Sequence, residues 1–309
     1  MLPSLVRTLE CGFRYVVMIG FDQGDLLFDS PHTKAKVSAW LEKHFVADAA
    51  SRGIDASFRL LAVANDLKKP GPVFNAMARA VVDTDGLDQG RDQVAEYIYR
   101  VNDDTEFATL LWTSKFVAAL GAMGPPANVG VVGPSCPQGN RAILTHDFTH
   151  RSHMEIFGGL GTVGGAGVGE EDAATAGSSS SISSSSSSSS SSAFGGYYPP
   201  VLTDWFMDDW ISRVYGSKRT KLLKDVEVVH HSKTYGRRYD VDGKHRHLVD
   251  ELVESGKERV LKFLKKRGAS AEALKRFSSD RFNHRQQQRE VDQSTISRKS
   301  SAVRPPGHR

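Results

Sequence analysis

Two adjacent carboxylates follow a short strand-forming segment and are well suited to bind a cation. Residues 97–101 are aromatic or β-branched apart from one arginine, and Asn102, Asp103 and Asp104 follow them directly. Neighbouring carboxylates repel each other unless a positive charge lies between them. The carboxyl ends of strands in an open α/β sheet are also where ligands bind. The pattern predicts a site for a hard divalent cation that shares its ion with substrate phosphates. A solvated turn or a helix cap is the alternative, since Asn and Asp favour both.

A second acidic pair, Asp208 and Asp209, lies among large apolar side chains, namely Trp205, Phe206, Met207 and Trp210. Removal of a carboxylate from water raises its pKa and strengthens its interactions with other charges. These are the properties of a general base or of a group that binds a substrate hydroxyl. The alternative is that the pair balances the dipole at the N-terminus of a helix.

Basic and imidazole groups that suit a phosphate or a metal follow further along the chain. His230 and His231 end a strand-like segment, and a histidine at a ligand-facing strand end can complete a metal shell. Arg237 and Arg238 follow in a predicted loop and could neutralise a diphosphate. A structural histidine and a solvated turn are the alternatives.

Residues 145–157 contain three histidines whose spacing suggests a different metal. If this segment is a helix, His146, His150 and His153 lie near one face and could bind Zn²⁺ in a metallohydrolase. No glutamate lies between the histidines and no cysteine accompanies them, which weakens this interpretation. A polar helix that lines an acceptor pocket fits the same pattern.

Apolar segments of strand length alternate with segments of helical periodicity. Continuous apolar runs predict strands that are buried on both faces, at residues 13–22, 58–65, 97–101 and 128–133. Helices are expected between them, including residues 32–50 and 71–82. This order predicts an α/β protein with a doubly wound, mostly parallel sheet. Three of the strands end in Asp22, Asn65 and Asp103, which would place polar groups at one binding edge.

The C-terminal half divides into segments of different composition. Residues 158–196 are rich in Gly, Ala and Ser, and they contain a serine run at 178–192. Ordering such a segment costs about 1–2 kcal/mol of backbone entropy per residue, and it has little apolar surface to offset that cost. We therefore expect a disordered insertion. Structure resumes in residues 197–243, and residues 244–309 should form a helix and a disordered basic tail.

The net charge of +4 is unevenly distributed. Residues 1–243 carry a net charge of −5, whereas residues 244–309 carry +9. Few aromatic residues accompany the basic ones, so we expect a solvated tail and no nucleic-acid partner. No apolar run reaches the roughly 18 residues of a transmembrane helix, and two cysteines do not make a disulfide framework.

Taken in order, these motifs resemble those of GT-A fold nucleotide-sugar glycosyltransferases. The N-D-D-T segment after the third strand, the acidic pair in F-M-D-D-W-I and the late histidine are most similar to the exostosin-type hexosaminyltransferases. The resemblance covers roughly residues 13–242. It implies a donor-binding half at residues 1–157 and an acceptor-binding, catalytic half at residues 197–243.

The resemblance also implies roles for individual residues. Asp104, with Asn102 or Asp103, would hold Mn²⁺ or Mg²⁺ and the donor diphosphate, and His230 would contact the metal or the diphosphate. Asp208 or Asp209 would orient the acceptor hydroxyl. Asn75, in the helix G-P-V-F-N-A-M, would lie near the nucleotide.

GT-A domains normally begin with a strand whose loop holds the nucleotide base, whereas this sequence begins at the expected following helix, residues 3–10. We therefore expect the first strand either to precede Met1 or to be absent, and its absence would weaken nucleotide binding. Localisation is left unassigned, with the secretory pathway expected if a missing N-terminal segment carries a membrane anchor.

Three functions are consistent with these patterns. The first is a metal-dependent glycosyltransferase that moves a hexose or hexosamine from a UDP-sugar to a glycan hydroxyl. The second is a non-catalytic relative that binds a glycan or a protein partner. The third is the histidine-rich metallohydrolase.

Overall fold

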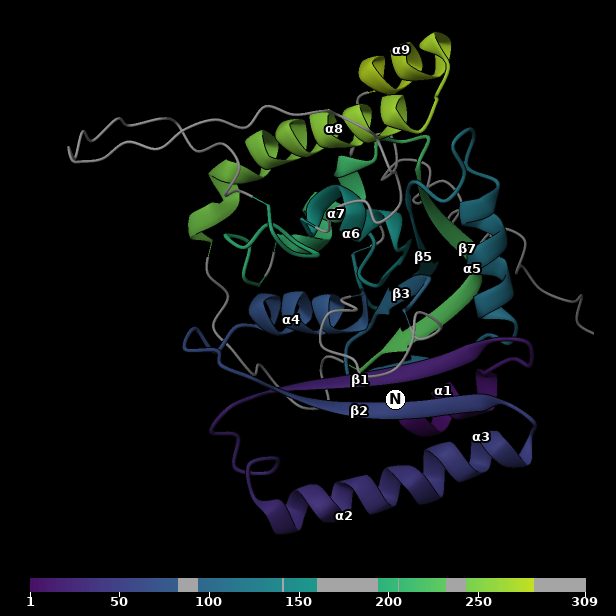
Figure 1. The fold of residues 1–309 in the computed structure, drawn as a ribbon, viewed down its shortest axis with the longest axis vertical. Helices are drawn as coiled ribbons and strands as arrows, with labels where there is room; N and C mark the ends of the chain where they lie inside the picture. Colours follow the sequence, from purple (N-terminus) through teal and green to yellow (C-terminus); the bar gives the residue numbers. More distant parts are fainter. Residues whose placement is uncertain (83–93, 141, 160–193, 205, 232–242, 281–309) are drawn as a thin grey trace, which may run out of the picture.

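A parallel pair of strands and a five-stranded sheet form the framework of the protein (Figure 1). The computed structural model describes residues 1–82, 94–140, 142–159, 194–204, 206–231 and 243–280. Strand β1 (Arg14–Asp22) pairs in parallel with β2 (Asp55–Val63) along its whole length. The connection between them is helical, with α2 (Pro31–Leu41), one π-helical turn (Glu42–Val46) and α3 (Ala47–Ser51). Ser30 caps α2 by accepting a hydrogen bond from the backbone N–H of Thr33.

The larger sheet has the strand order β3-β6-β5-β7-β4. Its strands are β3 (Tyr97–Arg100), β4 (Thr105–Phe107), β5 (Val131–Ser135), β6 (Asp147–His150) and β7 (Thr220–His230). Strands β5 and β7 are parallel, and the other three pairs are antiparallel. The two longest ladders of the protein, β1–β2 and β5–β7, are therefore both parallel.

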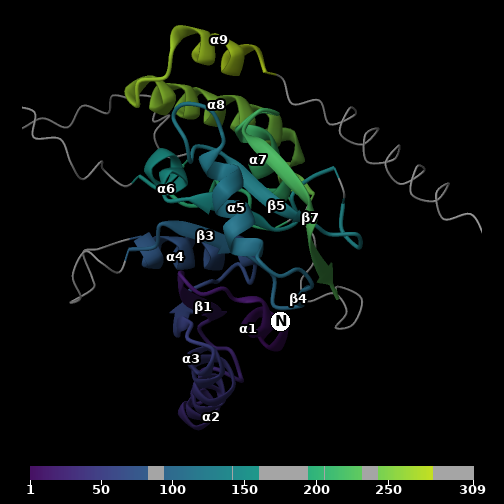
Figure 2. The same ribbon diagram turned by 90° about the vertical axis from the view of Figure 1, so that its right-hand side faces the viewer.

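Helices cover this framework on several sides (Figure 2). In the N-terminal half they are α1 (Leu2–Thr8), α4 (Pro70–Val82), α5 (Trp112–Gly121) and α6 (Ser152–Phe157). In the C-terminal half they are α7 (Met207–Val214), a 3₁₀ turn (Lys244–Leu248), α8 (Val249–Lys266) and α9 (Ala271–Ser279). Helices α8 and α9 lie at one end of the molecule and α2 lies at the other. No helix among the described residues is long and apolar enough to cross a bilayer.

Two clusters of buried apolar side chains hold these layers together. The larger cluster surrounds Trp210, which is fully buried and donates its indole N–H to the Leu252 carbonyl at 3.2 Å. Gly133 of β5 lies so close to β6 that a Cβ atom there would stand 2.3 Å from the His146 carbonyl oxygen. Glycine is required at this position because that neighbour is backbone and cannot move aside.

The prediction of a mixed α/β fold with mostly parallel pairing is confirmed by the two longest ladders, which are both parallel. The four apolar runs overlap β1, β2, β3 and β5, although β2 begins before its run and β5 ends after it. The predicted single doubly wound sheet is not observed among the described residues, where β1 and β2 form a sheet separate from the other five strands. The sequence did not predict β6, which lies between β3 and β5 and is antiparallel to both. This short strand falls in the histidine-rich segment that could be taken for a helix. Contacts to two neighbouring strands, rather than local periodicity, determine its conformation.

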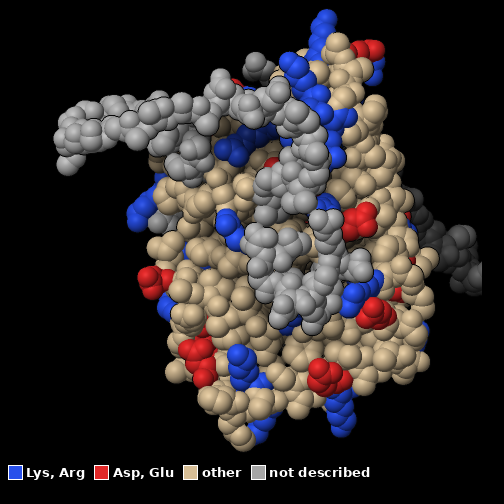
Figure 3. Space-filling model, in the orientation of Figure 1, with Lys and Arg blue, Asp and Glu red and all other residues tan. Residues whose placement is uncertain are grey.

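The C-terminal segments differ in part from expectation. Phe194 is buried in the larger core, so the folded body resumes before residue 197. The serine run and residues 281–309 lie outside the described part of the chain. Helix α8 contributes Val253, Val260 and Leu264 to the same core and is an integral part of the fold. Lys and Arg side chains gather over α8 and α9, as the positive charge of residues 244–309 suggests (Figure 3).

Candidate functional site

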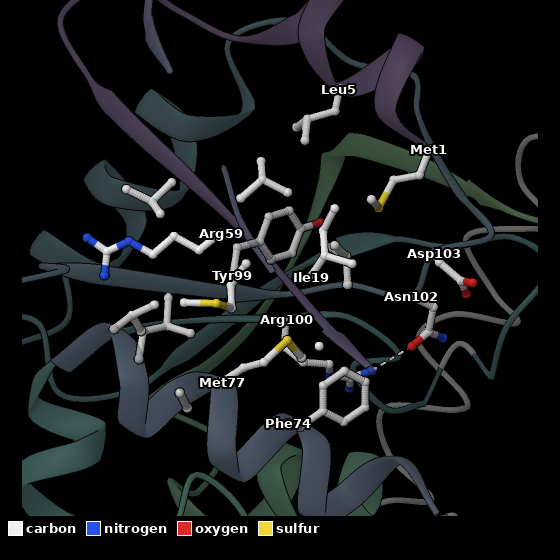
Figure 4. A pocket seen from close by; sticks show the side chains of 18 of the residues that line it. Met1, Leu5, Ile19, Arg59, Phe74, Met77, Tyr99, Arg100, Asn102 and Asp103 are labelled. Atoms are coloured by element: carbon white, nitrogen blue, oxygen red, sulfur yellow. Dashed lines mark hydrogen bonds between the residues drawn. The ribbon is translucent and has the colours of Figure 1, made fainter. Parts of the chain in front are cut away.

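A cavity of about 1930 Å³ lies between β1, α4 and β3 (Figure 4). Five of its lining residues are connected by hydrogen bonds or ion pairs, and we call them the polar end: Arg100, Asn102, Asp104, Asp208 and His230. Asp103 lines the same cavity beside Asn102. Helix α7 brings Asp208 to the end of β3, and the β4–β7 pair brings His230 to Asp104. Residues far apart in the sequence thus converge on one site.

Arg100 is the centre of a buried ion network at the end of β3. Its guanidinium donates to Asp147 through Nε at 2.9 Å and forms an ion pair with Asp208 through Nη2. Asp147 is fully buried and also accepts hydrogen bonds from the hydroxyls of Tyr197 and Tyr198. One cation therefore holds two carboxylates, of which Asp147 is sealed in the interior and Asp208 lines the cavity.

Asp208 has the electrostatics of a carboxyl group that can exchange a proton near neutral pH. Burial raises its pKa to about 6, although the neighbouring Arg100 acts in the opposite direction. About a quarter of the side chain is exposed, so the carboxyl remains accessible from the cavity. Such a group can act as a general base on a bound hydroxyl.

Asp104 and His230 form a close pair at the same end of the cavity. The His230 Nε2 atom is 2.9 Å from Asp104 Oδ1, and both side chains are largely buried. Asn102 approaches the same imidazole nitrogen at 3.4 Å. The backbone fixes this pair, because Thr105 lies opposite His230 in the β4–β7 ladder and the N–H of His231 donates to the Asp104 carbonyl.

His146 packs against this pair through contacts with Thr105 and the His230 ring. It is buried, its Nε2 lies 2.6 Å from the Thr105 hydroxyl, and its ring stands edge-on to His230 at 5.5 Å between centroids. Burial lowers the pKa of His146 well below its ordinary value, and the positive charge of Arg100 adds to the effect. A neutral imidazole at this position adds no positive charge beside His230.

Asp104 and His230 fit a divalent cation that takes only some of its coordinating ligands from the protein. Two adjacent ligands of an octahedral ion, each about 2.1 Å from it, are about 3 Å apart. The observed 2.9 Å between Asp104 and His230 matches this spacing, and it is also the distance of a direct ion pair. Among the described residues no group of three or more His, Cys, Asp or Glu side chains could hold a metal. Any ion bound here therefore needs ligand oxygens from a substrate or from water.

The cavity lining contains a further set of polar contacts. Lys69 forms a 2.9 Å ion pair with Asp204, and both residues line the cavity. Asn65 donates to Asp22 at 2.7 Å and to the Lys69 carbonyl at 2.9 Å, which ties together the ends of β1 and β2. Asp22, Asn65 and Asp103 each follow or end a strand, as predicted. Asp22 and Asp103 line the cavity, whereas Asn65 does not and reaches it only through its hydrogen bond to Asp22.

Two predicted site residues lie elsewhere. Asp209 is not among the residues that line the cavity, and its carboxylate lies 3.7 Å from Arg213 on the same helix. Asn75 also lies off the cavity, because its amide both donates to and accepts from the backbone of Tyr198, at 3.1 and 2.8 Å. It fastens the segment after the insertion to α4. Arg237 and Arg238 fall outside the described residues.

The proposed zinc site of three histidines is wrong as a geometric arrangement. His146 precedes β6, His150 ends β6 and His153 belongs to α6, so the three do not share a helix face. His153 is fully buried, and burial lowers its pKa to about 4. Its Nε2–H donates to the Tyr197 carbonyl and its Nδ1 accepts from the Tyr215 hydroxyl, which is the bonding of a neutral structural histidine.

Sequence reasoning missed the residues that hold Asp208 in place. Arg100 lies two residues before Asn102, the first residue of the N-D-D-T segment, and Tyr197 and Tyr198 follow the serine-rich insertion. The signals available were a lone arginine within an apolar strand and a pair of tyrosines at the point where structure resumes. Neither signal identifies Asp147 as the common partner.

Comparison with known proteins adds no identification. No protein-family model, no curated protein and no solved structure matches this chain.

The raised pKa of Asp208 predicts a pH-dependent contribution to stability. The folded state holds this proton more tightly than the unfolded chain, so the stabilisation is fully present below about pH 4 and is lost as the pH rises through about 6. Asp208→Asn keeps a neutral group at all pH values. Its free energy of unfolding, relative to the unmodified protein, should therefore rise by about 1–3 kcal/mol between pH 4 and pH 7. Urea unfolding of both proteins at pH 4, 5, 6 and 7 measures this difference, and a difference that does not change with pH would contradict it.

Proposed function

We propose that this protein is a metal-dependent glycosyltransferase that moves a hexose or hexosamine from a UDP-sugar to a glycan hydroxyl. The observation that carries the proposal is the convergence of the Asp104–His230 pair and the Asp208 carboxyl on one cavity. The Asp104–His230 pair is suited to bind a cation shared with a diphosphate, and the Asp208 carboxyl is suited to accept a proton from an acceptor hydroxyl. The GT-A-like character of the fold is part of the same proposal.

Each residue of the polar end has a distinct role in this proposal. Asp104 and His230 would hold Mn²⁺ or Mg²⁺, which supplies electrostatic stabilisation of negative charge that develops on the departing diphosphate. Asn102 contacts both Arg100 and His230 and would keep the two halves of the site in register. Asp208 would orient the acceptor hydroxyl and accept its proton, while Arg100 fixes the position of the Asp208 carboxyl.

The proposal is tested by Asp104→Asn in the chain of residues 1–309. The substitution removes the anionic ligand and preserves the shape of the side chain, so Mn²⁺-dependent binding of UDP should weaken by about tenfold or more. Isothermal titration with UDP, in the presence and absence of Mn²⁺, measures the binding. Release of UDP from UDP-sugars measures turnover, which should also require Asp104.

The matched control is Asp48→Asn, because Asp48 is an exposed carboxylate on α3 and is not among the residues that line the cavity. It should leave both quantities unchanged. Undiminished Mn²⁺-dependent turnover in Asp104→Asn would overturn the metal site. A chain that is folded but takes up no UDP with Mn²⁺ would favour the non-catalytic alternative, a protein that binds a glycan or a partner.

A further inference from the structure

The cavity extends well beyond the polar end and is far larger than one small ligand requires. Its volume of about 1930 Å³ is about twice the upper end of the usual range for small-molecule sites, roughly 300–1,000 Å³. All residues of β1 and of β3 line it. At about 3.3 Å per residue, the nine residues of β1 give the cavity a length of about 30 Å.

Both long sides of the cavity are open strand edges. Among the described residues, β1 pairs only with β2, and β3 pairs only with β6. An edge strand presents a row of N–H and C=O groups that can pair with another strand. Buried backbone groups are nearly always hydrogen-bonded, so two edges that line one cavity form a template for a strand between them.

The apolar part of the cavity wall comes from opposite sides of the β1–β2 pair. Helix α4 lies on one side and α2 on the other (Figures 1 and 2). Val73 and Met77 of α4 line the cavity, as do Val37 and Trp40 of α2. A strand buried between two helical layers carries apolar side chains on both faces. These apolar residues therefore match the side chains of a continuous apolar strand.

Tyr99 supplies an independent observation in the middle of the cavity wall. Its ring packs against Phe107, Trp112, Phe116 and Phe148, but its buried hydroxyl has no hydrogen-bond partner among the described residues. Burial raises the pKa of this hydroxyl well above its ordinary value, so it stays protonated. Buried polar groups without a partner are uncommon in folded proteins, and a backbone group arriving in the cavity could supply one.

We propose that this cavity is a docking groove for one extended, apolar β-strand of about nine residues, supplied by a polypeptide segment outside residues 1–309. The strand pairs with the open edges of β1 and β3 and joins the two sheets into one. Its side chains enter the spaces beside α2 and α4. One terminus of the docked strand lies near Asn102 and Asp103, where it covers the polar end on the side that faces β1. This inference concerns the fold and does not depend on the proposed catalytic activity.

A fusion of a designed strand to the full chain tests the proposal. The probe is a segment of about nine Val and Ile residues joined to Met1 through a Gly-Ser linker, matching the length expected of the groove. The control is the same fusion with Pro at alternate strand positions, which cannot donate the ladder hydrogen bonds. Hydrogen exchange measured by mass spectrometry follows the amides of β1 and β3, with β5 as an internal reference.

Exchange in β1 and β3 should slow by about tenfold or more in the Val/Ile fusion relative to the Pro control, while β5 is unchanged. Equal exchange in the two fusions would overturn the groove. The proposal also fails if β1 and β3 of the unfused chain already exchange as slowly as β5, because both edges would then be paired. Protection of the unfused chain that grows with protein concentration would identify a second copy as the occupant and overturn it too.

Discussion

Replacing Asp147 with asparagine is expected to lower the free energy of unfolding by about 3–5 kcal/mol. Asp147 is fully buried and accepts hydrogen bonds from Arg100, Tyr197 and Tyr198. Asparagine keeps the volume of the side chain but removes its charge. One carboxylate oxygen is replaced by an NH₂ group, which cannot accept the hydrogen bonds that Arg100 and the two tyrosines donate. Arg100 then remains buried with only the partly exposed Asp208 as its anionic partner.

Chemical denaturation at pH 7 measures this loss, with Asp55→Asn as the matched control. Asp55 is an exposed carboxylate that pairs with Arg14 at 3.4 Å, so the same substitution there should change stability by less than about 0.5 kcal/mol. The double replacement Arg100→Met with Asp147→Leu removes both charges and should be less destabilising than the sum of the single ones. Equal losses in Asp147→Asn and Asp55→Asn would show that the network does not support the fold.

The elements that carry the polar end could be predicted because their signals are local. Continuous apolar runs predicted β1, β2 and β3, and the polar residues after those runs marked the cavity edge. The structure places Asp104 and His230 2.9 Å apart. For the strands, a run of a few residues contained the whole signal, whereas the pairing of Asp104 with His230 was expected only from the resemblance to GT-A glycosyltransferases.

The choice between Asp208 and Asp209 could not be made from the sequence, because it depends on the rotational phase of one helix. Consecutive residues on a helix point about 100° apart, so only one of two adjacent carboxylates can face a given cavity. Burial of Trp210 and Ile211 against the larger core fixes α7 with Asp208 toward Arg100 and Asp209 toward Arg213.

The hydrogen-bond and ion-pair partners of Arg100 and Asp147, which lie far away in the sequence, also could not be predicted. Arg100 and Asp208 are 108 residues apart, and the serine-rich insertion lies between Asp147 and its two tyrosines. Asn75 is a further case in which the sequence did not indicate a side chain's partner. Its helix was predicted correctly, but its amide is used by the backbone of Tyr198, a contact that no local pattern encodes.

Asp208→Asn is expected to reduce UDP-sugar turnover by about 10²–10⁴-fold, because the variant lacks the group proposed to accept the hydroxyl proton. Mn²⁺-dependent UDP binding should stay intact, because Asp104 and His230 are retained. In the unmodified protein the carboxylate form of Asp208 grows as the pH rises through about 6, so turnover should rise over the same range. The steady-state rate of UDP release between pH 5 and pH 8 measures both effects. The neighbouring replacement, Asp209→Asn, is the matched control.

The two variants together decide which carboxylate acts on the acceptor. Asp209 lies beside Arg213 and off the cavity, so Asp209→Asn should change turnover by less than about threefold, within the range of ordinary surface substitutions. A larger loss in Asp209→Asn than in Asp208→Asn would reverse the roles. It would require α7 to rotate by about 100° and thereby break the Arg100–Asp208 ion pair and withdraw Trp210 from the core. The buried position of Trp210 makes such a rotation costly, so the phase of α7 itself argues that Asp208 is the carboxyl presented to an acceptor.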